Sequence, residues 1–291
     1  MKRVLITGAG SYIGTSFQKY LLQWADQYFV DTVDMIGDSW KKKDFSNYDV
    51  IYHVAGIAHS DIGNATEEVK ALYYKVNTDL TIETATKAKA EGVKQFIFMS
   101  SAIVYGDSAP VGKAKIITKD TIPTPANFYG DSKLKAEKGI LPLGDSNFKV
   151  VVLRPPMIYG KGSKGNYPIL AKYACKFPVF PDVENCRSML YIENLLEFVR
   201  LIIENNESGI FFPQNEEYVK TSILVKEIAK VHGKKVFLTR IFNPLIHLMS
   251  KRVKLLNKVF GNLCYAKELS VYKGKYCRTN FEQSIKETEA L

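Results

Sequence analysis

A strand, a glycine-rich turn and a helix follow one another at the start of this chain, and this order constrains the fold more than any other feature. Residues 3–7 are a short apolar run with β-branched members, typical of a buried parallel strand. Glycines follow at once, and Ile13, Phe17 and Leu21 then recur at helical spacing. Because a helix N-terminus offers unpaired N–H groups and a positive dipole end, the segment predicts a pyrophosphate-binding site.

The glycine spacing of this segment is unusual. Gly8 permits a tight turn and Gly14 permits close packing of helix on strand, but Ser11 stands where a G-x-x-G-x-x-G motif has its middle glycine. Gly10 lies one place earlier and supplies the flexibility instead. An ordinary glycine-rich turn is the alternative interpretation. The residues predicted to bind a cofactor here are Gly8, Gly10, Ser11, Tyr12, Ile13 and Gly14.

An acidic residue closes the next predicted strand, residues 28–34. An acid about 20 residues beyond the glycines binds both ribose hydroxyls of an adenosine and repels a 2′-phosphate. Asp34 is preferred over Asp31 because it lies at the carboxyl end of the strand. No arginine follows closely, which favours NAD over NADP, although the run Lys41-Lys42-Lys43 complicates that choice.

Strand and helix signals alternate as far as about residue 160. Buried strands are predicted at 50–55, 95–100 and 149–154, and helices at 67–91 and 129–138. The alternation implies an α/β fold with a Rossmann-like, doubly wound parallel sheet, whose ligands gather at the carboxyl ends of the strands. We expect a dinucleotide-binding domain at 1–159 with 188–212 returning to it, and a substrate-binding lobe at 160–187 and 213–291 that opens with loops at 160–180.

Composition is that of a globular protein. Hydrophobic residues make up 46% and charged residues 24% of the 291 residues, and no apolar run is long enough to span a membrane. The N-terminus enters a strand directly, so we expect no signal peptide and a cytoplasmic location. Because Cys175, Cys186, Cys264 and Cys277 show no C-x-x-C spacing, we expect reduced thiols and predict no metal site.

Positive charge gathers in one C-terminal stretch. Residues 228–267 contain nine lysines and arginines and no acid, in a chain of formal net charge +10. Asn243-Pro244 opens a predicted helix with an apolar stripe that runs from Leu245 to Phe260 beside basic residues. Such a helix binds weakly to anionic membrane. The favoured alternative is a lobe helix packed by its stripe. Nucleic acid is not expected as a partner, because no recognised nucleic-acid motif is present.

Tyr129 and Lys133 carry the catalytic signal. In Tyr129-Gly130-Asp131-Ser132-Lys133 a phenol and an ammonium lie one helical turn apart. A hydroxyl carbon gives hydride only if its proton leaves too, and a tyrosine takes that proton when its pKa is lowered from about 10. The ammonium favours the phenolate. Ser101 ends a predicted strand and is placed to hydrogen bond the same substrate oxygen, with Ser100 as the alternative.

Six segments together resemble the extended short-chain dehydrogenases/reductases of the NAD-dependent nucleotide-sugar epimerase/dehydratase type. They occur in family order over about two thirds of the chain, at 7–14, 52–56, 99–106, 129–133, 153–160 and 187–194. The resemblance implies that Lys133 holds the nicotinamide ribose, that Ser101 and Tyr129 contact the substrate hydroxyl, and that Arg187 binds a substrate diphosphate through its planar fork. It implies further cofactor contacts at Asp44, Phe45, Ala55, Gly56, Ile57 and Pro156. Met157 departs from the asparagine of some family epimerases.

The implied activity is NAD-dependent 4-epimerisation of a nucleotide sugar, a UDP-hexose or UDP-N-acetylhexosamine, through a transient 4-keto intermediate. A nucleotide-4-keto-sugar reductase uses the same residues, and the sequence does not separate the two. A catalytically inactive dinucleotide-binding regulator is the alternative of another class, but it need not keep Ser101, Tyr129 and Lys133 together.

His59 and Asp61, just past a predicted strand end, are further candidates for substrate contact. A homodimer is compatible with the sequence.

Overall fold

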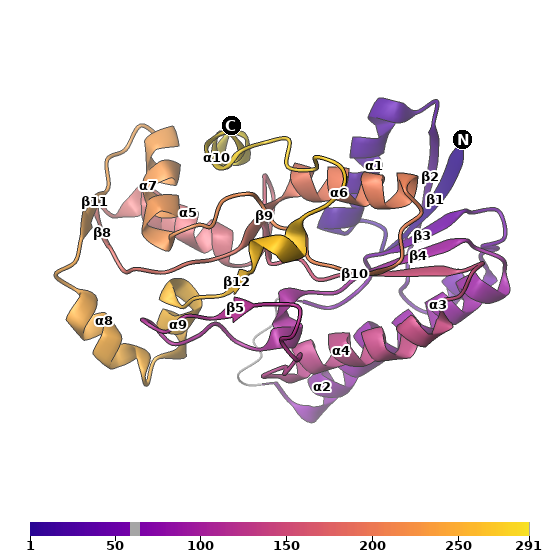
Figure 1. Cartoon of the computed structure of the whole chain (residues 1–291), viewed down its shortest axis with the longest axis horizontal. Coiled ribbons are helices and arrows are strands. Elements are labelled where there is room, and N and C mark those ends of the chain that lie inside the picture. Colours follow the sequence, from indigo (N-terminus) through magenta and orange to yellow (C-terminus); the bar gives the residue numbers. More distant parts are fainter. Residues whose placement is uncertain (59–64, 291) are drawn as a thin grey trace. The chain divides into compact units, whose positions relative to one another are not determined.

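The computed structural model describes residues 1–58 and 65–290, so that His59 and Asp61 lie outside the described residues (Figure 1). The chain forms two compact units, and each unit is assembled from separate stretches of chain. Unit 1 comprises Met1–Gly106, Pro123–Pro155 and Leu195–Pro213, and unit 2 comprises Asp107–Ile122, Pro156–Asn194 and Gln214–Leu291. The stretches 107–122 and 188–194, which the sequence placed with the N-terminal domain, therefore belong to unit 2.

Unit 1 is built on a parallel sheet, as the alternating strand and helix signals predict. Its strand order is β10-β6-β4-β3-β1-β2. After β1, the chain adds β2 on one side and then β3 and the later strands on the other side, so the strand order reverses between β1 and β3. Ligands of such sheets bind at the carboxyl ends of the strands beside this reversal. The strands are β1 (Lys2–Thr7), β2 (Tyr28–Val33), β3 (Val50–His53), β4 (Gln95–Met99), β6 (Lys149–Leu153) and β10 (Gly209–Phe211).

Helices cover both faces of this sheet, with α1 and α6 on one face and α2, α3 and α4 on the other (Figure 1). The central strands consist of apolar residues with no accessible side-chain surface, among them Leu5, Ile51 and Phe96, because both faces are covered. The helices are α1 (Tyr12–Leu21), α2 (Glu67–Tyr74), α3 (Leu80–Ala90), α4 (Phe128–Ile140) and α6 (Ile192–Glu204).

The predicted helix at 67–91 is continuous but irregular. A π-helical turn at Lys75–Asp79 separates α2 from α3, and Asn77 within it is fully buried. Such turns widen a helix locally and are frequent at functional sites.

Unit 2 contains short strands in pairs and several helices. The pairs are β7 with β9, β8 with β11, and β5 with β12, all parallel. Among the described residues no helix is long and apolar enough to cross a membrane. The elements are β5 (Ile116–Ile117), β7 (Met157–Tyr159), α5 (Asn166–Lys176), β8 (Val179–Pro181), β9 (Met189–Tyr191), α7 (Thr221–Val231), β11 (Phe237–Thr239), α8 (Asn243–Ser250), α9 (Lys254–Phe260), β12 (Cys264–Tyr265) and α10 (Phe281–Glu289).

Two expectations for unit 2 are wrong. The stretch 160–180 is not only loop, because Asn166–Lys176 forms α5, whose Tyr167, Leu170 and Ala174 are buried. The predicted helix from Asn243 is broken at 251–253 into α8 and α9, and Leu245, Leu248 and Met249 of its apolar stripe are exposed rather than packed. Periodicity marked an amphipathic helix there but could not show which of its faces meets the protein.

Candidate cofactor and catalytic site

The glycine-rich turn joins β1 to α1 at the point where the sheet order reverses. Gly8 has φ +81°, and its N–H donates to the Val33 carbonyl at 2.9 Å. A Cβ on Gly8 would lie 2.9 Å from Cα and 3.0 Å from N of Ala55, which follows β3. Gly10 has φ +77° with open space around it. The turn therefore requires a residue without a side chain at Gly8, because the backbones after β1 and β3 approach each other so closely.

Ser11 and Gly14 begin α1 in complementary ways. The Ser11 hydroxyl caps the helix by accepting the Gly14 N–H at 3.1 Å. A Cβ on Gly14 would lie 3.1 Å from Ile6 Cγ2 and 3.2 Å from Val54 Cγ2, so Gly14 lets α1 pack closely on the sheet. The Tyr12 hydroxyl beside this turn is buried and has no hydrogen-bond partner among the described residues, and burial raises its pKa to about 12.

The two aspartates of β2 and its end have different surroundings. Asp31 is engaged with the Lys43 ammonium at 2.7 Å and the Tyr48 hydroxyl at 2.6 Å. Asp34 follows the strand, is exposed, and accepts the Ile36 N–H at 3.0 Å, its one hydrogen bond among the described residues. The structure thus leaves the Asp34 carboxylate accessible, which supports its choice over Asp31. Lys43 is neutralised by Asp31, which removes one cation of the run that complicated the cofactor preference.

The predicted adenine contact at Asp44 and Phe45 has little support. The Phe45 side chain has no accessible surface and packs in the core with Trp40, at 6.5 Å between ring centroids. Asp44 is exposed and accepts the Ser46 N–H at 2.8 Å. A ring contact from Phe45 to a cofactor is excluded in this conformation, because burial of a large apolar side chain in the core is strongly favourable.

The loop after β3 is held by Asn77 from the π-helical turn. Its amide oxygen accepts the Ile57 N–H at 2.8 Å, and its amide nitrogen donates to the Ile57 carbonyl at 3.1 Å. Asn77 Nδ2 also lies 3.2 Å from Ser132 Oγ on α4. Asn77 therefore stabilises the backbone of the predicted cofactor loop.

Ser101, Tyr129 and Lys133 are brought together within unit 1. Gly130 allows this, because a Cβ there would lie 2.7 Å from the Ile103 carbonyl oxygen, so the start of α4 touches the turn after β4. The Ser101 hydroxyl hydrogen bonds with Tyr129, and it also caps the following 3-10 turn at Ile103 N, 3.3 Å away. Lys133 Nζ lies 3.1 Å from the position of a Cβ on Gly56, and donates to the Met99 carbonyl at 3.0 Å.

The acid–base properties differ from the expectation. Burial, with a smaller contribution from the neighbouring Tyr73, raises the pKa of Tyr129 to about 12, although the Ser101 hydrogen bond acts in the opposite direction. The predicted lowering by Lys133 is not seen. The ammonium instead donates to a carbonyl and lies 4.7 Å from the Phe98 ring centroid. Burial lowers the pKa of Lys133 to about 8, partly offset by the Glu137 carboxylate.

A buried ion-pair cluster supports the end of β4, and sequence reasoning missed it. Glu137 and Arg154 are almost fully buried and form a salt bridge. Ser100 donates to Glu137, and Arg154 Nη1 donates to the Tyr105 hydroxyl at 2.6 Å. Ser100 is therefore occupied in the core, which favours Ser101 as the substrate contact. The available signal was Glu137, one helical turn after Lys133 on the same face of α4.

Arg187 belongs to unit 2, as does Pro156, which precedes β7. Its guanidinium donates to the carbonyls of Lys258 at 2.7 Å and Gly261 at 3.2 Å, at the C-terminus of α9. Its side chain is half-buried. Burial lowers its pKa to about 10, and no described carboxylate forms an ion pair with it. A desolvated cation without a counter-ion is suited to bind an anion.

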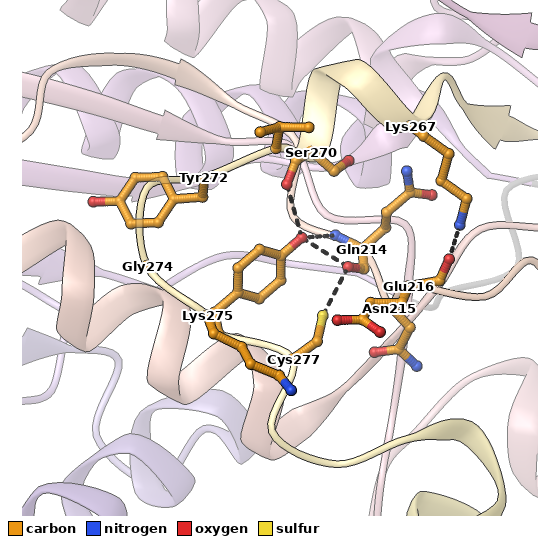
Figure 2. Close-up of a pocket in the computed structure, with 11 residues that line it drawn as sticks. Gln214, Asn215, Glu216, Lys267, Ser270, Tyr272, Gly274, Lys275 and Cys277 are labelled. Atoms are coloured by element: carbon orange, nitrogen blue, oxygen red, sulfur yellow. Dashed lines mark hydrogen bonds between the residues drawn. The ribbon is translucent and has the colours of Figure 1, made fainter.

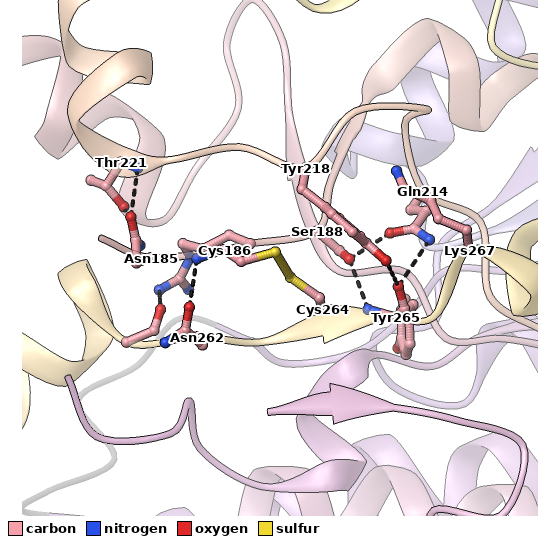
Figure 3. Close-up of a disulfide and its surroundings, with 12 residues drawn as sticks. Asn185, Cys186, Ser188, Gln214, Tyr218, Thr221, Asn262, Cys264, Tyr265 and Lys267 are labelled. Carbon is pink, nitrogen blue, oxygen red and sulfur yellow. Dashed lines mark hydrogen bonds between the residues drawn. A yellow bond between two sulfur atoms is a disulfide. The ribbon is translucent and has the colours of Figure 1, made fainter. Parts of the chain in front are cut away.

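The expectation of reduced thiols is wrong for Cys186, the residue before Arg187. Cys186 and Cys264 form a disulfide with a Cα–Cα distance of 6.4 Å, where reduced thiols were expected (Figure 3). Their separation of 78 positions hides the pairing in the sequence, but the Leu263 N–H donates to the Cys186 carbonyl at 3.1 Å and brings the two segments together. Cys175 and Cys277 are free.

A pocket of about 290 Å³ in unit 2 contains none of the predicted site residues (Figure 2). Lys267 donates to the Glu216 carbonyl at its edge, and the Cys277 thiol donates to the Gln214 carbonyl at 3.4 Å. Burial raises the pKa of Cys277 to about 11, so its thiol is protonated at neutral pH and is a poor nucleophile.

Comparisons with known proteins agree with this arrangement. The UDP-glucose 4-epimerase of Vibrio cholerae is 32% identical over 78% of this chain and 75% of its own length. The N-acetyl-alpha-D-glucosaminyl-diphospho-ditrans,octacis-undecaprenol 4-epimerase of Escherichia coli O157:H7 is 27% identical over 95% of this chain and 86% of its own. The fold matches that of UDP-glucuronic acid 4-epimerase from Bacillus cereus in complex with NAD, with a TM-score of 0.73, 18% identity, and coverage of 99% and 97%.

Most of the chain also matches one family description. Residues 4–212 match the NAD dependent epimerase/dehydratase family, a range that contains the cradle, the predicted catalytic residues and Arg187. The fold expected from the alternating strands and helices, a Rossmann-like parallel sheet, is confirmed by the sheet itself and by these structural neighbours. The chain belongs to the NAD-dependent epimerase/dehydratase family.

Proposed function

We propose that this protein is an NAD-dependent 4-epimerase of a nucleotide sugar, a UDP-hexose or a UDP-N-acetylhexosamine. One observation carries the proposal: Ser101 hydrogen bonds with Tyr129 in unit 1, and Lys133, one helical turn further along α4, has its Nζ beside Gly56 in the loop after β3. Two relatives that match most of the chain are both 4-epimerases. We assign unit 1 to the dinucleotide and unit 2 to the sugar nucleotide.

The residues around the β1–α1 turn fit NAD. The Gly8 position has no room for a side chain, Gly10 faces open space, and the Tyr12 hydroxyl is a buried polar atom that lacks a partner among the described residues. The first turn of α1 supplies N–H groups for the pyrophosphate, and Asp34 supplies an accessible carboxylate for the ribose hydroxyls. NAD bound by these residues would supply the hydride acceptor for carbon 4 of the sugar and, once reduced, the hydride donor.

The protein's own groups move the proton. Tyr129 holds its proton at neutral pH in this state, since its pKa is raised to about 12. It therefore serves directly as the acid that reprotonates the 4-keto oxygen. To accept the proton of the 4-hydroxyl, Tyr129 needs its phenolate to be stabilised. The Ser101 hydroxyl is a hydrogen-bond partner for that purpose, and we propose that the Lys133 ammonium, one helical turn along α4, adds its positive charge.

Arg187 binds the substrate diphosphate in this proposal. Its guanidinium is desolvated, carries no ion pair with a described residue, and uses one nitrogen for the carbonyls at the end of α9. The remaining N–H groups form the planar fork that phosphate oxygens accept. A second role, as a cap that holds α9, is compatible with the same contacts.

The alternatives differ in cofactor turnover. A nucleotide-4-keto-sugar reductase would consume a reduced dinucleotide in each cycle, whereas an epimerase recovers its NAD and needs none added. An inactive regulator would bind dinucleotide without converting any sugar. The experiment is to denature the purified protein, identify any released dinucleotide, and incubate the native protein with a panel of UDP-sugars without added cofactor.

Tyr129→Phe is the decisive variant, because it keeps the ring and removes the proton-transfer group. We expect turnover to fall by on the order of 10² or more, with dinucleotide still bound. Tyr74→Phe is the matched control, since Tyr74 also hydrogen bonds to α4, through Asp131 at 2.7 Å, but lies outside the proposed chemistry. Equal turnover of the two variants on a verified substrate would refute the role of Tyr129.

Three further features remain predictions. A cytoplasmic location and a homodimer are compatible with the chain, and gel filtration with light scattering decides the second. Besides the nucleotide-sugar substrate, the predicted partner is an anionic membrane, which the basic C-terminal stretch contacts weakly.

A further inference from the structure

Seven large apolar side chains are exposed on and beside the helices α8 and α9 of unit 2, whose backbones are drawn in Figure 1. Ile241 is 77%, Leu248 66% and Leu255 63% exposed. Monomeric proteins rarely keep apolar side chains gathered at the surface unless another surface covers them. The complete set consists of Ile241, Phe242, Leu245, Leu248, Met249, Val253 and Leu255, and with the cations Lys251, Arg252, Lys254 and Lys258 it is called the α8–α9 surface.

Anchors on the inner side hold these helices in place. Ile246 and Ser250, one turn apart on α8, are buried, and so is Phe260 at the end of α9, which lies 5.7 Å from the Phe180 ring. Asn257 joins the two helices, because its amide donates to the Ser250 carbonyl at 2.9 Å and accepts the Val111 N–H at 3.1 Å. The outward direction of Leu245, Leu248 and Met249 is therefore fixed by packing on the opposite face.

The charge around these apolar side chains has one sign. Lys251, Arg252, Lys254 and Lys258 are exposed, and none of them forms an ion pair with a described residue. No acidic residue occurs anywhere between 228 and 267. The surface combines exposed apolar side chains with uncompensated cations.

We propose that the α8–α9 surface docks on an anionic phospholipid bilayer, with Leu245, Leu248 and Leu255 inserted below the headgroups. The four cations then pair with lipid phosphates, and the contact is peripheral, since no described helix can cross a bilayer. The sequence predicts weak membrane contact of this amphipathic stretch, and the structure adds which apolar side chains are exposed for insertion. It does not depend on the epimerase activity.

Charge complementarity favours a bilayer over a second copy of this chain. A symmetric dimer through this surface would place the same four cations opposite each other, and like charges across an interface are unfavourable. An anionic bilayer offers phosphates to the cations and hydrocarbon to the leucines at the depth each requires. Both components of the surface are satisfied only by the bilayer.

Co-sedimentation of the full chain with vesicles tests this contact. We expect binding to vesicles of equal parts phosphatidylglycerol and phosphatidylcholine at low salt, weaker binding at 0.5 M salt, and little binding to phosphatidylcholine alone. Binding to neither vesicle type would overturn the proposal.

Matched variants separate insertion from charge. Leu248→Ser with Leu255→Ser should lower the partition coefficient by about tenfold or more, from the transfer free energy of leucine side chains. The control Leu22→Ser changes a leucine of similar exposure, 69%, in unit 1 and should leave binding unchanged. Lys251→Ala with Lys254→Ala should weaken binding by about fivefold per cation, with Lys119→Ala as control.

The pattern of results decides each part. If the serine variants bind as the wild type does, insertion is wrong. If the wild type is a dimer that these variants dissociate, and it binds no vesicle, the surface is an interface between copies and the proposal is overturned. Conversion of soluble UDP-sugars is measured on the same samples, so a failed epimerase assay beside intact vesicle binding would remove the proposed function alone.

Discussion

Gly8→Ala tests the close approach of the β1 and β3 ends that forms the cofactor cradle. An L-residue at φ +81° costs about 1–2 kcal/mol, because its Cβ meets the backbone. The new Cβ would also lie 2.9 Å from Ala55 Cα and 3.0 Å from Ala55 N, which are backbone atoms that cannot rotate away. Overpacking of this kind adds about 1–3 kcal/mol, so the total loss of unfolding free energy should be about 2–5 kcal/mol.

Gly92→Ala isolates the second contribution. Gly92 has φ +82°, nearly the value of Gly8, but a Cβ there meets nothing within 4 Å. Strain and the loss of unfolded-state entropy are the same for both variants and cancel in their difference. The difference in unfolding free energy, measured by urea titration, should therefore equal the contact contribution of about 1–3 kcal/mol.

NAD binding gives a second readout of the same pair. Calorimetry on protein freed of dinucleotide should show NAD affinity reduced at least tenfold in Gly8→Ala, because displacement of Ala55 moves the loop that continues to Gly56. Gly92→Ala should bind NAD as the wild type does. If the two variants have equal stability and equal NAD affinity, the close approach at Gly8 does not shape the cradle.

Two further predictions concern charges in the site. Burial lowers the pKa of Lys133 to about 8, and ribose hydroxyls accept hydrogen bonds best from its ammonium form, so NAD binding should raise that pKa. The protein should therefore take up protons when it binds NAD near pH 8, and its NAD affinity should fall as the pH rises through 8. Calorimetry in two buffers of different ionisation enthalpy measures the proton uptake, and an unchanged uptake in Lys133→Met would contradict the assignment. Arg187→Ala should weaken UDP binding by about 10–100-fold with NAD affinity within twofold; a loss of stability with unchanged UDP affinity would show that Arg187 only caps α9.

The strand, turn and helix at the N-terminus were predictable from the sequence because their constraints are local. A strand, a turn with glycine at Gly8 and a helix beginning at Ser11 fix one another within a few residues, so pattern and structure agree there. Asp34 illustrates the same point, since its place at the strand end left it exposed while Asp31, three residues earlier, found Lys43 and Tyr48 as partners.

Properties that depend on distant partners were not predictable. The raised pKa of Tyr129 comes from desolvation by the folded protein and not from the residue four places along the helix. The Phe45 ring entered the core, although an acidic-apolar pair resembled an adenine contact. Glu137 on α4 forms a cluster with Ser100, just after β4, and Arg154, just after β6, and the two cysteines of the Cys186–Cys264 disulfide are 78 positions apart.

The α8–α9 surface shows most clearly why amphipathic patterns remain ambiguous. A stripe of leucines beside lysines states only that the two kinds of side chain separate on a helix, and packing of the stripe in the core was the favoured interpretation. The structure assigns the inner contacts to Ile246, Ser250 and Phe260 instead, which leaves the leucines outside. A helix held on its inner face by so few residues leaves its apolar outer face to water unless another apolar phase covers it, and the four cations beside it, which have no ion pair among the described residues, are the reason for proposing an anionic bilayer as that phase.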